Sequence, residues 1–209
     1  MAAGDAQFYH DIITEKSFKF LRELVKKYNF VLIGGWAVYL FTRSLKSKDI
    51  DIIVDYEELA KLKNNFDVFK NDRLKKYEIE TGEFDVDIYL PHYSDLGIKA
   101  EAIKRKTISS EGFVLPAAEM LLLLKLYARA ARRGTPKGKK DELDIFSLIA
   151  LPDFNWEKYL EYVNEFSFSR LNDSLRELIK KTRSVVELGI NEQRMSKIRK
   201  EILGKIGRH

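Results

Sequence analysis

The sequence predicts an α+β protein in which a small mixed sheet flanked by helices is followed by a helical C-terminal half. In the first half, short apolar or alternating segments stand between amphipathic segments long enough to form helices. In the second half, apolar residues recur mainly at helical spacing almost to the end of the chain. No Gly/Ser-rich linker separates the halves, and we expect two domains, 1–112 and 113–209.

The elements of the first half follow from periodicity. Phe18, Leu21, Leu24 and Val25 recur at helical spacing with basic residues between them, which predicts an amphipathic helix. Strands are indicated where apolar residues form a short run or alternate with polar ones. In chain order we expect a helix at 14–28, a strand at 30–33, a helix at 36–45, a strand at 49–55, a helix at 56–66 capped by Asp55, and strands at 75–80 and 83–90.

The second half begins with a loop and a hairpin over residues 103–115. Pro116 suits the first turn of a long helix, and Gly134-Thr135-Pro136 ends that helix. Asn191 is a typical N-cap for the last helix. The helices expected here are 116–133, 139–151, 155–166, 169–188 and 191–206.

Composition limits the possible classes of protein. The 209 residues are 45% hydrophobic and 33% charged, as in a globular protein with a genuine core. Cysteine is absent, which excludes disulfides and thiolate metal sites and favours a reducing cytoplasm. No signal peptide or membrane-spanning run is present, so we expect a cytoplasmic protein without a membrane partner. A net charge of +5 is compatible with an anionic partner such as a nucleotide or RNA.

Two acidic residues interrupt a strand that otherwise suits burial. Asp49 and Asp51 are spaced two apart, so both carboxylates project to one side and repel each other unless a cation lies between them. Mg²⁺ is typically held by one or two carboxylates together with substrate phosphates. A third carboxylate would come from a neighbouring strand, and we favour Asp87 over Asp85 because Asp87 lies deeper in its apolar run.

Gly34 and Gly35 stand between a buried strand and a helix. Glycines at such a position let phosphate oxygens approach the backbone N–H groups of a helix N-terminus, where the helix dipole favours anions. Together with the carboxylates, they predict a combined metal and phosphate site.

Taken in order, Gly34-Gly35, a helix, Asp49-Ile50-Asp51 and then Val86-Asp87-Ile88 resemble the DNA polymerase beta-like nucleotidyltransferase superfamily. The later segments LLLLKLYARAARR and KKDELDIFSL are similar to the helical portion of small stand-alone prokaryotic members, including antibiotic nucleotidyltransferases and type IV toxin-like proteins. The resemblance covers roughly residues 20–150, and the last sixty residues resemble no family that we can name.

The resemblance implies a nucleotidyltransferase fold and specific roles. Asp49 and Asp51 would ligate two Mg²⁺ ions, and Asp87 would ligate the ion nearer the acceptor and help to deprotonate it. Gly34 and Gly35 would hold the triphosphate of an NTP such as ATP. The implied reaction moves an NMP from the NTP to an acceptor hydroxyl and releases pyrophosphate. Further nucleotide contacts are implied for Ser47, Lys125 and Lys140.

Other interpretations stay open at this level. The acceptor could be a small molecule, an RNA or a protein, and the chain could act as a toxin on tRNA or protein, or as a nucleotide- or RNA-binding module without turnover. A monomer and a homodimer both fit the sequence. Trp36 suits either base stacking or the core, and Lys140 suits either phosphate binding or a salt-bridge cluster with Asp141 and Asp144. The basic stripe of the C-terminal helices suits either solubility or an RNA surface.

Overall fold

The computed structural model describes residues 3–207, and side chains are described from residue 11 onward. The chain forms two compact units, Met1–Ala117 and Ala118–His209. The boundary expected at residue 112 falls in the turn between two paired strands, the second of which also pairs with the strand at 31–33. Residues 113–116 therefore belong to the sheet of the first unit.

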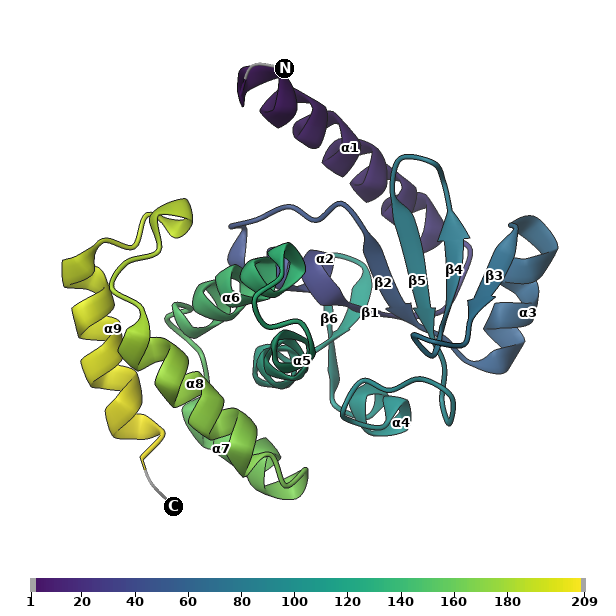
Figure 1. The fold of residues 1–209 in the computed structure, drawn as a ribbon. Helices are drawn as coiled ribbons and strands as arrows, with labels where there is room; N and C mark the ends of the chain where they lie inside the picture. The colour runs from purple at the N-terminus through teal and green to yellow at the C-terminus, as the bar shows by residue number, and fades with distance from the viewer. Residues whose placement is uncertain (1–2, 208–209) are drawn as a thin grey trace. The chain divides into compact units, whose positions relative to one another are not determined.

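The first unit is built on a seven-stranded sheet with the order β3-β4-β5-β2-β1-β7-β6, seen in Figure 1. β2 runs parallel to β5 and antiparallel to β1, and β1 runs parallel to β7, so the sheet is mixed, as expected. The strands are β1 (Val31–Ile33), β2 (Ile50–Ile53), β3 (Val68–Asn71), β4 (Lys76–Glu80), β5 (Asp85–Tyr89), β6 (Thr107–Ser110) and β7 (Phe113–Pro116).

The sheet has one apolar and one acidic face where β2 and β5 pair. Val86 and Ile88 are fully buried on one side, and Asp85 and Asp87 alternate with them on the other. The predicted alternation of this strand is confirmed. Because side chains alternate between the two faces of the strand, the carboxylates point away from the core, which the helices cover.

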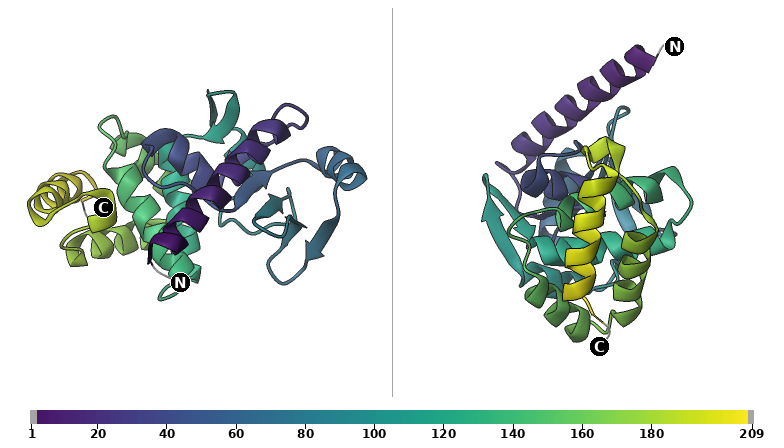
Figure 2. Two further views of the ribbon diagram at one scale, coloured as in Figure 1. Left: turned by 90° about the horizontal axis from the view of Figure 1, so that it is seen from above. Right: turned by 90° about the vertical axis from the view of Figure 1, so that its left-hand side faces the viewer.

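Helices pack on the apolar face. The Phe20 ring of α1 lies 5.6 Å from the ring of Phe84, which shares the face of Val86, and the Phe18 ring lies 4.7 Å from that of Trp36 on α2. Figure 2 follows α1, in purple, beside this sheet. The helices of this unit are α1 (Ala3–Leu24), α2 (Gly34–Thr42), α3 (Tyr56–Asn65) and α4 (Ala100–Lys104).

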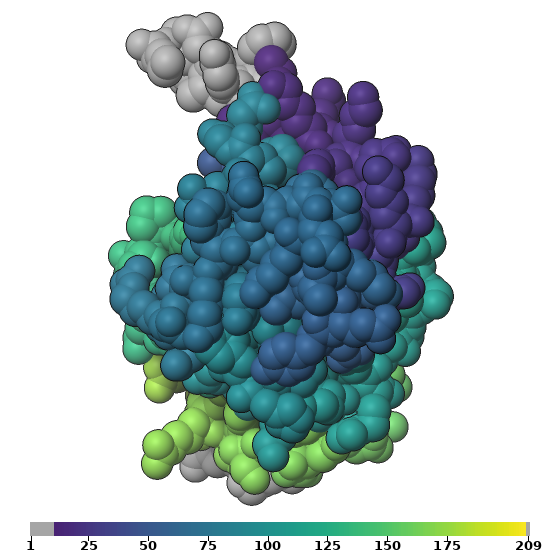
Figure 3. Space-filling view, turned by 90° about the vertical axis from the view of Figure 1, so that its right-hand side faces the viewer, coloured from purple at the N-terminus to yellow at the C-terminus, as the bar shows by residue number. Residues whose placement is uncertain are grey.

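The edge strand β3 is the element of the sheet that the sequence did not predict. Phe69 on this strand is 53% exposed, and Val68 is only half-buried. A strand at the edge of a sheet that buries so little shows weak alternation, because its side chains face solvent on both sides. Figure 3 shows the surface that α3, β3 and β4 form on this side of the unit.

The second unit consists of helices around a buried apolar core. Pro116 ends β7, so the first helix begins two residues later than expected. Asn155 and Asn191 cap their helices through side-chain oxygens that accept hydrogen bonds from backbone N–H groups, as predicted for Asn191. Figure 2 shows α9, in yellow, beside α8. The elements are α5 (Ala118–Ala131), α6 (Pro136–Ile149), α7 (Trp156–Glu165), α8 (Ser169–Lys181), a 3₁₀ turn (Val186–Leu188) and α9 (Glu192–Lys205).

Two further local details bear on the sequence predictions. Asp55 occupies the N-cap position of α3, but its side chain makes no capping hydrogen bond and instead lies 2.5 Å from the Lys104 ammonium. Within residues 3–207, no helix combines the length and the apolar character that crossing a membrane requires.

The bond between Trp36 and Ser17 provides a test of this packing. The Trp36 indole N–H donates to the Ser17 hydroxyl at 3.0 Å, and both side chains are buried. Ser17→Ala leaves that N–H without an acceptor, so we expect the free energy of unfolding to fall by about 1–3 kcal/mol in urea titrations. The control Ser109→Ala, at an exposed position, should change it by less than about 0.5 kcal/mol. Equal losses in the two variants would contradict this account.

Candidate active site

A row of carboxylates crosses the acidic face of the first unit. Asp51 on β2 lies directly opposite Asp87 on the parallel neighbour β5, and Asp87 lies opposite Glu78 on the antiparallel neighbour β4. Adjacent strands are about 4.8 Å apart, and directly opposed residues project to the same side. The sheet therefore places carboxylates from three separate segments of the chain side by side on one face.

Asp49 and Asp85 extend this group at the start of the two strands. The backbone N–H of Asp85 donates to Asp49 Oδ1 at 3.4 Å, a long hydrogen bond. Asp49 is half-buried, whereas the Asp85 side chain is exposed. Asp87 is thus the carboxylate that lies opposite Asp51, while Asp85 lies at the exposed end of β5.

Gly34 brings the start of α2 directly against Asp51. Its φ is +68°, in the left-handed region, and a Cβ atom at this position would lie 2.0 Å from Asp51 Oδ2. Only glycine meets both conditions without a shift of the carboxylate. The backbone N–H groups of the first helical turn, at Gly34 and Gly35, have no intrahelical acceptor and are suited to bind an anion.

Lys76 places a cation on this face. Its ammonium lies 2.6 Å from Asp87 Oδ2 and 2.7 Å from Glu78 Oε1, and the residue is only 9% exposed. Burial opposes the charged form of Lys76, but the hydrogen bonds to Asp87 and Glu78 outweigh it and raise the lysine pKa. The ammonium therefore neutralises part of the buried negative charge.

Asp87 is the most perturbed group of the site. Burial, followed by the charge of Asp51, raises its pKa to about 7, although the bond to Lys76 acts in the opposite direction. A carboxyl group with this pKa exchanges its proton near neutral pH, which suits a proton acceptor in catalysis.

Three residues of the site escaped the sequence analysis. Besides Lys76 and Glu78, Tyr89 contributes a hydroxyl that donates to Asp51 Oδ1 at 3.3 Å. Asn71 donates to Glu78 at 3.2 Å, which fixes the glutamate from the strand beyond it. Alternating Lys and Glu in KYEIE is typical of a solvated strand, so only the register of β4 with β5 could have identified Lys76 and Glu78 as site residues.

The donor chemistry of the face fits Mg²⁺. Asp51 and Asp87 supply hard oxygen atoms, and the absence of a Cβ at Gly34 lets the Asp51 carboxylate lie against the start of α2. In the part of the chain that the structure describes, no three acidic or histidine side chains already converge as a metal-binding group. Asp87 would have to exchange its contact with Lys76 for the metal.

Ser47 lies in the segment that leads into β2. Its hydroxyl donates to the backbone carbonyl of Asp49 at 3.0 Å, and the residue is buried. This bond shapes the bend from which Asp49 enters the strand. The implied contact of Ser47 with a phosphate stays a prediction.

Lys125 and Lys140 belong to the second unit. Lys125 is buried on α5, where its ammonium lies 2.6 Å from Asp144 and 3.3 Å from Asp141. Asp141 and Asp144, the carboxylates considered as partners of Lys140, both contact Lys125. Lys140 is half-buried on α6, and the nucleotide contacts implied for both lysines stay predictions.

Trp36 belongs to the core. It is 1% exposed, and its indole N–H is bonded to Ser17, so it offers no ring face to a base.

Comparison with known proteins identifies the fold. The chain is similar to a structure described as a "putative nucleotidyltransferase" from Helicobacter pylori, with 19% identity and a TM-score of 0.52. The match covers 94% of this chain and 98% of the other. The expected nucleotidyltransferase fold, a mixed sheet with flanking helices and a helical C-terminal half, is thereby confirmed.

Two further likenesses are weaker. An antigenic nucleotidyltransferase-like protein from Paracoccidioides brasiliensis has 18% identity and a TM-score of 0.40 over 86% of this chain and 97% of that one. The polyadenylate synthase of Megavirus has 13% identity and a TM-score of 0.47 over 66% of this chain and 31% of that one. At these TM-scores they add no argument. No protein-family model and no curated protein sequence matches the chain.

Gly34→Ala tests the contact between α2 and Asp51. The added methyl group must displace the Asp51 carboxylate and also strains the backbone, so we expect the free energy of unfolding to fall by about 2–4 kcal/mol in urea titrations. Gly112→Ala is the matched control, because Gly112 has φ +84° and nothing within 4 Å of the added Cβ. The control should lose only about 1–2 kcal/mol through backbone strain. An equal loss in both variants would mean that the contact with Asp51 contributes nothing.

Lys76→Met tests the charge balance of the acidic face. Because the pKa of Asp87 is raised from 3.8 to about 7, the folded chain binds more protons than the unfolded chain between those pH values, and stability falls as pH rises. Removing Lys76 increases the repulsion between ionised Asp87 and its acidic neighbours. We therefore expect the free energy of unfolding to fall by about 3 kcal/mol at pH 8 and by less at pH 5.

Urea titrations of the Lys76→Met variant at both pH values measure this difference. Lys70→Met is the control, because Lys70 forms an exposed pair with Asp72. The control should lose little stability, and equally little at both pH values, because solvent screens an exposed ion pair. A Lys76→Met loss that is the same at pH 5 and pH 8 would exclude ionised Asp87 as its cause.

Proposed function

We propose that the chain is a Mg²⁺-dependent nucleotidyltransferase that moves an NMP from an NTP to an acceptor hydroxyl and releases pyrophosphate. The observation that carries this proposal is the placement of Asp51 between Asp87 on one side and the Gly34 backbone on the other. A carboxylate pair beside a glycine-rich helix N-terminus offers ligands for a hard cation and N–H groups for phosphate in one place.

The chain's own residues then have distinct tasks. Asp49, Asp51 and Asp87 would hold two Mg²⁺ ions, which would neutralise charge on the triphosphate and on the leaving pyrophosphate. The N–H groups of Gly34 and Gly35 bind phosphate oxygens at the start of α2.

Asp87 is the proton acceptor of the proposed reaction. The acceptor hydroxyl forms a bond to the α-phosphorus, the bond from that phosphorus to the bridging oxygen breaks, and pyrophosphate leaves with the electron pair. Asp87, which lies directly opposite Asp51, takes the proton of the hydroxyl.

The mutual repulsion of Asp51 and Asp87 favours a catalytic role over that of a binding module without turnover. The charge of Asp51 contributes to the raised pKa of Asp87, which means that the two carboxylates destabilise each other in the folded chain. A protein that only bound nucleotides through its basic residues would have no physical need for this arrangement. The fold shared with the Helicobacter pylori protein described as a putative nucleotidyltransferase supports the same proposal.

Calorimetric titration with each of the four NTPs, with and without Mg²⁺, tests the donor site. We expect at least one NTP to bind only with the metal present, and Asp51→Asn to weaken that binding at least about tenfold, or about 1.4 kcal/mol. Asp72→Asn is the control, because Asp72 is an exposed carboxylate paired with Lys70. Binding that needs no Mg²⁺, or that survives Asp51→Asn unchanged, would overturn the proposed metal site. A confirmed donor site would be followed by transfer assays with α-labelled NTP and candidate acceptors.

The third carboxylate can be identified by a matched pair of variants. Asp87→Asn should abolish transfer of the labelled nucleotide, because it removes both a metal ligand and the proton acceptor. Asp85→Asn should retain most of the transfer rate, because that side chain is exposed at the end of β5. The reverse ranking would assign the role to Asp85.

A further inference from the structure

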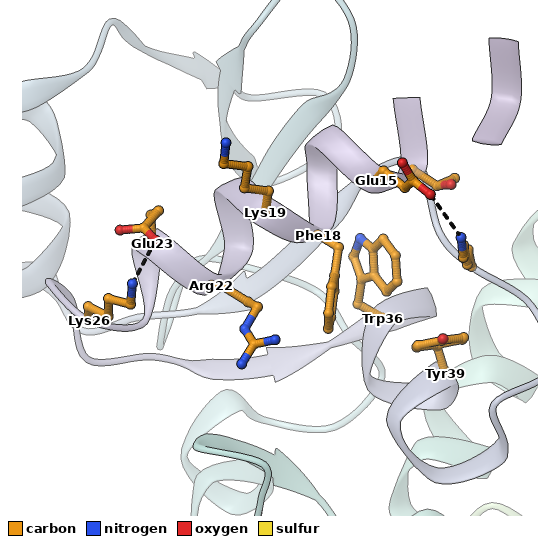
Figure 4. A pocket seen from close by; sticks show the side chains of 10 residues that line it. Glu15, Phe18, Lys19, Arg22, Glu23, Lys26, Trp36 and Tyr39 are labelled. Carbon is orange, nitrogen blue, oxygen red and sulfur yellow. Dashed lines mark hydrogen bonds and ion pairs between the residues drawn. The ribbon is translucent and has the colours of Figure 1, made fainter. Parts of the chain in front are cut away.

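A pocket of about 410 Å³ lies between α1 and α2 of the first unit (Figure 4). Its volume falls in the range of pockets that take small ligands, which is about 300–1,000 Å³. The lining residues that matter here are Phe18, Lys19, Arg22, Trp36, Tyr39 and Lys46, and we call it the α1–α2 pocket.

Aromatic rings form one wall of this pocket. Phe18 and Tyr39 are half-buried and lie on either side of the buried Trp36, with ring centroids 4.7 Å and 5.4 Å from the tryptophan. Figure 4 shows the three rings gathered from the two helices. Trp36 holds the other two rings in place, and those rings keep part of their surface accessible.

Cations outnumber carboxylates around the rings. Four lysines and arginines line the pocket against two glutamates. Glu23 is paired with Lys26 at 2.7 Å, and Glu15 lies 3.9 Å from Lys46. Among the described side chains, Lys19 and Arg22 form no ion pair with a carboxylate, and the charge of Lys19 is the smallest of the causes that lower the Glu23 pKa, so most of their charge is available to a ligand.

Arg22 places its charge next to the rings. Its guanidinium carbon lies 5.9 Å from the centre of the Phe18 ring, and Figure 4 shows the group beside that ring, whereas Lys19 points away from it. A ligand with a planar ring between two anionic groups would match this arrangement of aromatic surface and separated cations.

The pocket is distinct from the candidate active site. α1 and α2 pack on the apolar face of the sheet, through Phe20 against Phe84, whereas Asp51 and Asp87 lie on the opposite face. The two sites are nevertheless connected, because α2 begins at Gly34 beside Asp51 and the segment after α2 passes Lys46 before it reaches Asp49. A ligand in the pocket would contact the same helix that orders the acidic face.

We propose that the α1–α2 pocket binds a single-stranded nucleic acid, with one base against Phe18 and Tyr39 and neighbouring phosphates at Arg22, Lys19 and Lys46. Bases stack on aromatic side chains whatever their sequence, and cations along the groove follow the backbone phosphates. An acidic peptide would use the cations but would leave the aromatic wall unused. The pocket volume of about 410 Å³ suits one small group such as a single base, and the spread of Lys19, Arg22 and Lys26 along α1 suits the phosphates of a strand.

The test measures fluorescence anisotropy of labelled ten-nucleotide strands, one of RNA and one of DNA, with the full chain. Lys19→Gln/Arg22→Gln should weaken binding at least about tenfold near 100 mM salt. Three phosphate contacts predict a slope of log K against log salt of about −2 for the unaltered chain, and two fewer contacts a slope nearer −0.7. Comparing the two strands shows whether the 2′-hydroxyl contributes.

A matched control separates the pocket from general basicity. Lys180→Gln/Arg183→Gln removes the same charge from exposed positions of the C-terminal helical unit and should leave binding within about twofold. Tyr39→Leu keeps an apolar side chain but removes the ring, and we expect at least a fivefold loss. Thermal unfolding of each variant confirms that it is folded.

Several outcomes would overturn the proposal. A strand site at this pocket is excluded if the chain binds neither the RNA nor the DNA strand. It is also excluded if the pocket variant and the control lose equal affinity, or if a mononucleotide competes as well as the strand. Displacement of the strand by a decaglutamate peptide at equal concentration would assign the pocket to an acidic protein segment instead.

Strand binding at the α1–α2 pocket can be tested independently of the proposed function. Asp51→Asn should keep full affinity for the strand while it loses NTP binding. If the chain binds the strand at the pocket but no NTP with Mg²⁺, the proposed transfer reaction fails and the pocket assignment remains. If the strand also serves as the acceptor, its 3′ end should become labelled in the transfer assay, a further step that rests on the proposed function.

Discussion

The parallel pairing of β2 with β5 is the constraint on which the candidate site depends. It sets Asp51 beside Asp87, and the antiparallel neighbour β4 adds Glu78 to the same row. Three carboxylates on adjacent strands repel one another, so the surrounding structure must compensate. Lys76 does so from β4, and the missing side chain of Gly34 leaves Asp51 the space that it occupies.

Each unit contains a buried lysine shared by two acidic residues. Lys76 bridges Asp87 and Glu78 in the first unit, and Lys125 contacts Asp141 and Asp144 in the second. Buried ion pairs contribute little net stability relative to apolar packing. Removing one partner is nevertheless strongly destabilising, because it leaves the other charge buried and unpaired. Both clusters therefore restrict which substitutions the units tolerate, and burial and the charge of Asp51 keep the pKa of Asp87 at about 7 despite its bond to Lys76.

Much of the fold and part of the site could be predicted from local patterns. β5 buries every second residue, and β2 buries the isoleucines on either side of Asp51; both patterns are visible in the sequence. The failures have local physical reasons: β3 is an edge strand that buries little, and Pro116 ends a strand because the chain is still paired in the sheet there. Asp55 takes the N-cap position of α3 but bonds to Lys104, which lies far away in the sequence.

The sequence by itself determined most of the segments that become strands and helices, and that Asp49 and Asp51 share one side of a strand, because these properties depend on periodicity over a few residues. Only the tertiary structure decided that Glu78 and Lys76 join Asp87, that Lys125 pairs with Asp141 and Asp144, and that α1 and α2 enclose a pocket. Those contacts join residues distant in the chain. They depend on strand register and helix packing, which the burial of the whole apolar face decides.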